Sequence, residues 1–572
     1  MRYLLVIGPH YWLDLSNASS QRFQVELKCT PQTSRIKLQL PVWTPGSYLD
    51  RAYARHLEGL VVFQADQQLC AKRLTSSSWL LIVRPGLELS ISYGLLAVEA
   101  SVRSNWLDQG HGFLTAAAWA LEVGGQRWFG HTLSLKLPLG WQVATSLSQL
   151  GDGKYKADNY DQLIDCPIAL GAMEEITFDV GGVPHRWVWQ GLIKPAPLDQ
   201  WRWQLPLICS TVCRLMGVEH PPASGYLFMI RFCLDGFGGL EHDNNTALMF
   251  SRHELNTPAG VRRLFQLVAH EYLHQWNVRR LRPRELTPYN YSAETITASL
   301  WFAEGITSYY DSLLILRAGL CSNADYFDDL GKDINRYLCT PGKAVQSLVA
   351  SSEEAWIKLY RRDAHSDNQQ ISYYLKGQLV ALLLDIHLLS KGFCLGQLLQ
   401  ELWQRFGIYQ RGYSPEDLLN AAAKFDDNLL SILPIWLNSI EDLPLESTLL
   451  MVGMRLASAD EKHAFSGIGL ELNNGELRIC KLVRDSPGES AGLCVGDEIL
   501  AIDGERCRSI DFFDQNLQPK YNHRLLISHD GCISEMLLCP SIIKPLSWSL
   551  VEDPDAASDA IKLRCRWLQG HG

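Results

Sequence analysis

The sequence predicts a multidomain α+β protein, and three observations support this. At 572 residues the chain is too long for one hydrophobic core. Apolar and polar residues alternate with period two up to about Gly191, which predicts a β-sandwich. Helical periodicity then dominates to about Leu450, and short strand patterns with Gly-rich turns return from Phe465. We therefore expect domains over residues 1–191, 192–455 and 456–545, followed by a C-terminal tail over 546–572.

The alternation in the first domain is clearest in three segments. It places these apolar residues on one face: Phe23, Val25, Leu27, Cys29, Ile36, Leu38, Leu40, Leu87, Leu89, Ile91 and Tyr93. The segment Pro41–Tyr53 combines Pro, Gly and aromatic residues, so we expect a shaped loop there. The Pro-rich joint Ile193–Pro197 marks the change to helical periodicity and the domain boundary.

Composition and charge exclude several classes of partner. The chain is 47% hydrophobic and 20% charged, which is ordinary for a globular protein. A net charge of −10 provides no basic field for nucleic acid or anionic lipid. The first apolar stretch meets Pro9, His10 and Asp14 before a signal-peptide pattern develops, and later apolar runs are too short to span a bilayer. We expect a soluble protein without an export signal.

The fifteen cysteines show no paired spacing. This is typical of reduced thiols, so we expect a cytoplasmic location. Cys209 and Cys213 lie four residues apart in an apolar helical stretch, where core packing is favoured over metal binding.

A candidate metal site lies in the stretch Val261–Leu281, which has the pattern of an amphipathic helix. It carries the motif H-E-x-x-H, with His270, Glu271 and His274 at the fixed positions. Residues four apart share one helical face, so both imidazoles can reach one ion, while Glu271 is offset towards the attacking water. A chance match in a chain this long has a probability of roughly a few per cent.

A third ligand makes coincidence a poor explanation. The second helical stretch, Leu300–Tyr310, contains Glu304. Two His and one Glu leave a fourth position open, which is the catalytic arrangement of zinc. We therefore expect one Zn²⁺ per chain, with Asn277 and Ser308 as candidates for supporting the ligands.

These segments resemble the glycyl aminopeptidase family. The matching stretches are His270–Pro283 and Leu300–Tyr310, and the PVWTPGSY stretch in Pro41–Tyr53 is also similar. Members are gluzincin metallopeptidases with a thermolysin-like catalytic domain, distantly similar to aminopeptidase N. The interval between His274 and Glu304 holds 29 residues, longer than is usual in aminopeptidase N, which favours the glycyl aminopeptidase branch.

The stretch Gly236–His242 resembles the exopeptidase motif of aminopeptidase N. The resemblance implies that Glu241 binds the free α-amino group of the substrate, and a Gly-rich edge at Gly239 would let the backbone approach the peptide. Leu240 and His242 stand where relatives commonly have Met and Asn. An ordinary tight turn with a solvated Glu is the structural alternative.

A second motif, ISYYLKG, is similar to the Y-x-K-G stretch that carries a catalytic tyrosine in these enzymes. The resemblance assigns that role to Tyr374 rather than Tyr373. A phenol aimed at the developing oxyanion would stabilise it. Without the resemblance, both tyrosines would be interpreted as helix packing.

The C-terminal module looks like a PDZ domain. Ser466–Leu472 resembles the carboxylate-binding loop and strand, and Ser486–Cys507 has the A-G-L-x-x-G-D-x-I-L-x-I-D-G pattern. Such a loop can hold a peptide C-terminus while the strand edge pairs with the peptide backbone. A purely architectural role is the alternative.

Together these features predict a zinc-dependent aminopeptidase acting on peptides with a free N-terminus. The resemblance implies a preference for small first residues such as Gly or Ala. Three alternatives stay open: a zinc endopeptidase, a non-catalytic PDZ-bearing scaffold, and a hydrolase acting on another bond such as an epoxide.

Overall fold

The computed structural model describes residues 8–193, 197–458, 464–542 and 547–570. The chain forms two compact units: unit 1 is Met1–Thr295 with Leu399–Ser414, and unit 2 is Ile296–Leu398 with Pro415–Gly572. All three boundaries between the units fall inside the predicted domain 192–455. That domain therefore contributes to both units, because helical periodicity does not reveal which helices pack together.

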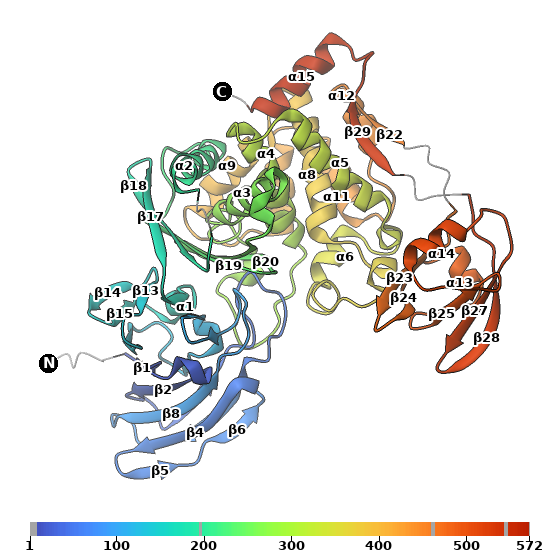
Figure 1. Cartoon of the computed structure of the whole chain (residues 1–572). Helices are drawn as coiled ribbons and strands as arrows, with labels where there is room; N and C mark the ends of the chain where they lie inside the picture. Colours follow the sequence, from blue (N-terminus) through green and yellow to red (C-terminus); the bar gives the residue numbers. More distant parts are fainter. Residues whose placement is uncertain (1–7, 194–196, 459–463, 543–546, 571–572) are drawn as a thin grey trace. The chain divides into compact units, whose positions relative to one another are not determined.

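The N-terminal part of unit 1 is built from short strands. They are β1 (His10–Asp14), β2 (Arg22–Cys29), β3 (Arg35–Gln39), β4 (Leu57–Gln64), β5 (Gln67–Leu69), β6 (Lys72–Thr75), β7 (Ser78–Ile82), β8 (Leu89–Leu96), β9 (Trp106–Leu107), β10 (His111–Leu114), β11 (Glu122–Val123), β12 (His131–Lys136), β13 (Gln142–Ala144), β14 (Ser148–Gly151), β15 (Lys154–Ala157) and β16 (Ile168–Gly171), with helix α1 (Tyr160–Ile164). The largest sheet has the order β14-β15-β12-β1-β2-β8-β4-β5, and two four-stranded sheets have the orders β13-β16-β10-β9 and β11-β3-β7-β6. Strands β2, β8 and β4 lie side by side (Figure 1).

The predicted alternation places the expected residues in the core of this β domain, with one exception. Ten of the eleven apolar residues of the pattern are buried: Phe23, Val25, Leu27, Cys29, Ile36, Leu38, Leu40, Leu89, Ile91 and Tyr93. Leu87 is 45% exposed because it lies in the turn before β8 rather than in the strand. The segment Pro41–Tyr53 forms no strand, as its composition predicts.

A further sheet in unit 1, which has five strands, has the order β17-β18-β19-β21-β20. Its strands are β17 (Glu174–Val180), β18 (Val183–Gln190), β19 (Tyr226–Cys233), β20 (Phe237–Glu241) and β21 (Asn245–Ser251). We expected residues up to 191 in the first domain, yet β18 pairs in parallel with β19. A period-two pattern predicts a strand but not the sheet that it joins. Of the predicted joint Ile193–Pro197, residues 194–196 lie outside the described residues.

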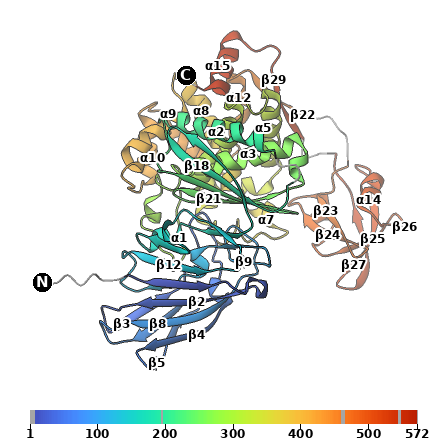
Figure 2. The same ribbon diagram turned by 60° about the vertical axis from the view of Figure 1, so that its left-hand side comes forward.

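Two helices cover one face of this sheet (Figure 2): α2 (Leu198–Leu215) and α3 (Pro258–Leu273). Cys209 and Cys213 are buried in α2, which confirms their prediction as core residues. Helix α3 starts with Thr257, whose side chain accepts a hydrogen bond from the Gly260 amide. It ends at Leu273, earlier than predicted.

The predicted helix extended to Leu281, but residues 274–281 form turns instead. The amide of Arg279 donates to the carbonyl of His274, and that of Leu281 donates to the carbonyl of Trp276. The apolar spacing continued past the helix because Trp276 and Leu281 are buried as turn residues.

Unit 2 is mainly helical. Its helices are the π-helix η6 (Trp301–Gly305), α4 (Ile306–Arg317), α5 (Asn323–Leu338), α6 (Leu348–Glu353), α7 (Ser366–Gln369), α8 (Tyr373–Ser390), α10 (Pro415–Ala423), α11 (Leu429–Asn438), α12 (Leu445–Met451) and α15 (Ser558–Gln569), while α9 (Leu395–Leu402) contains a unit boundary. Helices η6 and α8 meet at two glycines: a Cβ placed on Gly305 would lie 2.5 Å from the Cα of Gly377. This close approach places Glu304 of η6 beside the start of α8.

A separate sheet within unit 2 forms the C-terminal module. Its strands are β23 (Ile468–Asn473), β24 (Glu476–Leu482), β25 (Glu498–Ile502), β26 (Glu505–Arg506), β27 (His523–His529) and β28 (Cys532–Leu538), with helices α13 (Pro487–Ser490) and α14 (Ile510–Asn516). The order is β23-β24-β25-β27-β28, and β26 pairs with β25. The core is centred on Phe513, Leu525 and Ile527, which are fully buried.

The expected C-terminal tail, 546–572, is folded instead. Strand β29 (Trp548–Glu552) pairs with β22 (Met454–Ser458), and Trp567 of α15 donates a hydrogen bond of 2.9 Å to the Tyr309 hydroxyl. Their packing depends on contacts with distant segments, which the local sequence pattern does not show. The predicted boundary at 545/546 lies outside the described residues.

Within the described ranges, no single helix is both long and apolar enough to cross a bilayer. Helices Tyr373–Ser390 and Leu395–Gly407 satisfy length and composition only as a pair bent by 102°. The first of them, α8, is almost entirely buried in the protein, which is the environment of a core helix.

Candidate metal centre and active site

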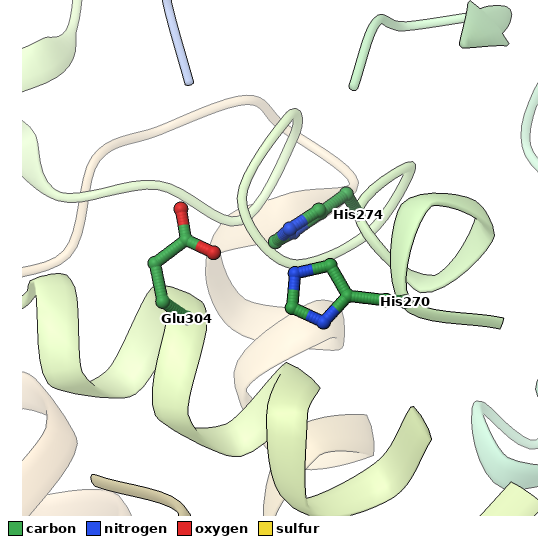
Figure 3. Close-up of side chains that lie close together, drawn as sticks. All are labelled: His270, His274 and Glu304. Carbon is green, nitrogen blue, oxygen red and sulfur yellow. The ribbon is translucent and has the colours of Figure 1, made fainter. Parts of the chain in front are cut away.

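The side chains of His270, His274 and Glu304 point toward one another (Figure 3). Each offers a ligand atom, and these atoms lie within 4.8 Å of one another. The two imidazole centroids are 4.6 Å apart because the residues stand one turn apart at the end of α3. His274 and Glu304 are buried, and His270 is half-buried. The structure thus brings the three predicted ligands together.

A hydrogen bond orients the second imidazole. Nδ1 of His274 lies 2.7 Å from the carbonyl oxygen of Asn277. Since a carbonyl only accepts, Nδ1 carries the proton and Nε2 is the ligand atom. Asn277 was predicted to support the ligands, and it does so through its backbone. Two imidazoles and a carboxylate, with one ring held in its ligand tautomer, fit a catalytic zinc ion.

The predicted base, Glu271, lies against strand β20. Its side chain is buried, and a Cβ placed on Gly239 would lie 2.0 Å from its Oε1. Only glycine therefore allows the strand and the carboxylate to approach this closely. Glu241, two residues further along β20, offers a carboxylate oxygen within 4.8 Å of ligand atoms of Glu271 and His274. Glu241 and Glu271 thus form a buried pair of carboxylates beside His274.

A buried ion network follows Glu241 in the chain. Nδ1 of His242 lies 3.0 Å from Oδ1 of Asp165, and Arg279 bridges Asp165 and Asp243 at 2.6 and 2.8 Å. His242 and Arg279 are buried. His242 replaces the Asn common in relatives, and here it anchors the end of β20 through this network.

Unit 2 contributes a cluster of phenols beside Glu304. The hydroxyl of Tyr360 lies 3.0 Å from that of Tyr374 and 3.1 Å from that of Tyr373. Burial, the Glu304 carboxylate and the neighbouring tyrosines raise the pKa of Tyr374 well above that of a free phenol. Tyr374 therefore stays a hydrogen-bond donor at neutral pH. Tyr360 carries no sequence signal and was missed.

Two further residues near the site come from the N-terminal β domain and were also missed. A guanidinium nitrogen of Arg103 donates a hydrogen bond of 2.8 Å to the carbonyl of Gly239. Gly46 lies against Glu241, since a Cβ placed there would be 2.3 Å from Oε2 of that carboxylate. Both contacts link residues far apart in sequence, so no local pattern could predict them.

His387 was expected to be a hydrogen-bonded structural histidine rather than a ligand. Its Nε2 lies 2.7 Å from a carboxylate oxygen of Asp426. The expectation is confirmed.

Comparisons with known proteins identify the domains. A family model described as M61 glycyl aminopeptidase matches residues 263–380, the Peptidase M61 N-terminal domain matches 10–172, and a PDZ domain matches 478–525. No match was found among curated protein sequences.

Among solved structures, an aminopeptidase N family protein from Idiomarina loihiensis is 29% identical, with a TM-score of 0.91 over 98% of this chain and 100% of that one. An M1 zinc metallopeptidase from Deinococcus radiodurans is 15% identical over 78% of this chain and 96% of that one, with a TM-score of 0.49, a likeness too weak to carry an inference. The matched domains and the His270, His274 and Glu304 group agree with the resemblance found in the sequence. The chain belongs to the M61 glycyl aminopeptidase family of zinc metallopeptidases and carries that family's N-terminal domain and a C-terminal PDZ domain.

Proposed function

We propose that this protein is a zinc-dependent aminopeptidase that hydrolyses the N-terminal peptide bond of peptides. The observation that carries the proposal is the position of Glu241, whose carboxylate offers an oxygen within 4.8 Å of ligand atoms of Glu271 and His274. A carboxylate this close to the base would hold an ammonium about one residue away from the bond that is cut. Only a peptide that begins there can place its first carbonyl at the centre.

His270, His274 and Glu304 would hold one zinc ion per chain. When bound, zinc polarises the scissile carbonyl and lowers the pKa of the attacking water towards about 7. Glu271 takes the proton from that water and returns it to the leaving amine, so the carboxylate ends the cycle as it began. Gly239 lets β20 lie against Glu271 and keeps this carboxylate in place.

Tyr374 would donate a hydrogen bond to the oxygen that gains negative charge in the transition state. Its raised pKa keeps the proton on the phenol, and the contact with Tyr360 fixes the direction of the hydroxyl. A pre-oriented donor in a half-buried site stabilises developing charge better than water does.

Glu241 would select for a free amino terminus. An α-ammonium pairs with its carboxylate, whereas N-acetylation removes both the charge and two of the donors. The preference for Gly or Ala at the first position is a further proposal that rests on family membership.

The PDZ domain would bind a peptide C-terminus. Strand β23 lies at the edge of its sheet, and Gly467 precedes it with φ of +74°. Loops of this kind hold a carboxylate while the strand edge pairs with the peptide.

The test compares a short peptide with N-terminal glycine and its N-acetylated twin, using zinc-loaded wild type and Glu271→Gln. We expect cleavage of the free peptide alone and a loss of roughly 10²- to 10⁴-fold in kcat for Glu271→Gln. Zinc content, measured by mass spectrometry, should stay at one ion per chain in both proteins.

Glu174→Gln is the matched control, because Glu174 is an exposed carboxylate on β17. It should cleave like wild type. Cleavage of both peptides would identify an endopeptidase instead. Cleavage of neither by a zinc-loaded protein would favour a scaffold or a hydrolase for another bond.

A further inference from the structure

The segment Thr44–Ser47 forms a tight turn. The amide of Ser47 donates a hydrogen bond of 3.0 Å to the carbonyl of Thr44, and Gly46 has φ of +82°. Pro45 before Gly46 is the sequence preferred for a type II turn, in which the third residue needs a positive φ. We call this segment the TPGS turn. Its shape follows from its own sequence.

Contacts from other segments of unit 1 hold the TPGS turn in place. The indole nitrogen of Trp43 donates a hydrogen bond of 2.7 Å to the carbonyl of Asn290. The hydroxyl of Ser47 accepts hydrogen bonds of 2.9 and 2.6 Å from the guanidinium of Arg51. Trp43 is fully buried. Hydrogen bonds thus hold the residue before the turn and the last residue of the turn, so the turn is preorganised.

The tip of the TPGS turn contacts the substrate-binding carboxylate. A Cβ on Gly46 would lie 2.3 Å from Oε2 of Glu241 and 2.6 Å from Oε1. Real Cβ atoms do not come this close to an oxygen, so the contact exists only because Gly46 has no side chain. The turn thus limits where the carboxylate of Glu241 can lie.

Two buried oxygens, one on Glu241 and one on the TPGS turn that contacts it, have no hydrogen-bond partner among the described residues. They are Oε1 of Glu241 and Oγ1 of Thr44, on side chains that are 4% and 1% exposed. A buried polar group without a partner is costly, and such groups are rare. A ligand that supplies donors would satisfy them. An alkylammonium has three donors and no acceptor, which suits a carboxylate beside a turn that carries a buried hydroxyl.

We propose that the TPGS turn is part of the subsite for the substrate's amino terminus. Gly46 positions the carboxylate of Glu241, and the Thr44 hydroxyl is a second acceptor for the ammonium. The N-terminal β domain therefore completes the active site rather than only supporting it. This inference rests on the proposed aminopeptidase function and names residues that the family's peptidase-domain motifs do not contain.

The test measures binding of glycinamide and N-acetylglycinamide to the zinc-loaded full-length protein by calorimetry, alongside kcat and KM for the glycyl peptide. We expect Thr44→Val to weaken glycinamide binding by roughly 10- to 100-fold, because a hydrogen bond to a charged group is lost. Gly46→Ala should weaken it at least as much, because the new methyl displaces the carboxylate. Thr44→Ser keeps the hydroxyl and should restore binding, and N-acetylglycinamide should bind all variants equally.

Two control variants separate these effects from general destabilisation. Gly125→Ala has the same φ of +82° as Gly46, but nothing lies within 4 Å of its new Cβ. Thr115→Val removes another buried hydroxyl that lacks a described partner, in the same domain but outside the proposed subsite. Both should bind glycinamide like wild type.

Each outcome decides the inference. If Thr44→Val and Gly46→Ala bind glycinamide no worse than their controls, the turn has no part in the subsite. If wild type itself does not distinguish glycinamide from its acetylated form, the proposed function fails first, and the inference fails with it. If Gly46→Ala unfolds by circular dichroism, Thr44→Val against Thr44→Ser still tests the hydroxyl. If Thr44→Val unfolds, Gly46→Ala against Gly125→Ala still tests the turn.

Discussion

The N-terminal β domain and the PDZ domain both flank the peptidase fold, but they contact it in different ways. In unit 1, Trp43 is fully buried and donates to the carbonyl of Asn290, while Arg103 donates to the carbonyl of Gly239 on β20. Gly46 reaches the carboxylate of the proposed substrate-binding glutamate. Two of these contacts, those of Arg103 and Gly46, end on β20, the strand that carries Glu241.

Within unit 2, the PDZ domain is held by polar contacts to the segment at α7. The side-chain amide of Asn368 donates to the carbonyl of Leu482 at 2.7 Å and accepts from the amide of Arg484 at 2.9 Å. Lys481 also pairs with Asp367, and both side chains are partly exposed. An exposed ion pair of this kind contributes little stability.

The difference teaches how to distinguish a domain that completes a site from one that is appended to it. A domain that completes the site makes buried contacts whose loss moves catalytic atoms. An appended domain is joined by a few polar contacts that can break without disturbing the core. On this criterion we place the β domain with the proposed active site, and we treat the PDZ domain as an appended domain.

The largest expected effect is that of Trp43→Ala. Removing this buried indole should lower the free energy of unfolding by about 3–5 kcal/mol, because it leaves a cavity and an unpaired carbonyl at Asn290. It should also raise KM for the glycyl peptide, since Trp43 adjoins the TPGS turn. Urea unfolding and steady-state kinetics measure the two effects.

Phe513→Ala is the matching truncation in the PDZ core, where Phe513 is fully buried. It should destabilise that domain by a similar amount yet leave turnover of short peptides unchanged. Equal loss of turnover in both variants would break the distinction between the two domains.

The metal centre could be predicted because its residues are local. His270, Glu271 and His274 need only the spacing of one helix, and Glu304 needs only a second helix to face it. The strand alternation was predictable for the same reason, since neighbouring residues decide which face is apolar. The prediction was wrong for Leu87, because this residue continues the alternation of the strand in sequence but lies in the turn before β8.

The parts that could not be predicted depend on contacts between distant segments. Strands β17 and β18 join the five-stranded sheet because β18 pairs with β19, and the alternation of β17 and β18 alone does not show which sheet they join. Arg103 and Gly239 are separated by 136 positions. Residues 546–572 were expected to be a tail, because the pairing of β29 with β22 and the packing of α15 depend on tertiary structure alone.

The next effect concerns acid stability of the β domain. His131 is 1% exposed, its Nδ1 lies 2.8 Å from the carbonyl of Phe129, and burial lowers its pKa from 6.5 to about 4. As pH falls, the unfolded chain binds a proton at His131 before the folded protein does. The free energy of unfolding should therefore be unaffected by His131 above pH 6.5 and should fall by roughly 3 kcal/mol as pH drops towards 4. Unfolding of wild type and His131→Phe across this range should show the difference.

The PDZ domain should respond in the opposite sense. The hydrogen bond to Asp497 raises the pKa of His529 above 6.5. The stability that His529 contributes to the PDZ domain is present below the pKa of the unfolded chain and is lost as pH rises through the pKa of the folded protein.

Acid-induced destabilisation that persists unchanged in His131→Phe would show that another group in the β domain dominates.

The smallest expected effect is that of Asn368→Ala, which removes both hydrogen bonds from α7 to the PDZ domain. The amide of Arg484 should then exchange with solvent roughly 10-fold faster, because it loses its acceptor. Asn428→Ala, an exposed asparagine elsewhere in unit 2, is the control. Asn368 precedes Tyr374 by only six residues. Turnover of short peptides should nevertheless change little, because Tyr374 is held by Tyr360 rather than by the PDZ domain. A large fall in kcat with unchanged KM would instead mean that the PDZ contact braces the phenol, and occupancy of the PDZ groove would then become a means of controlling the enzyme.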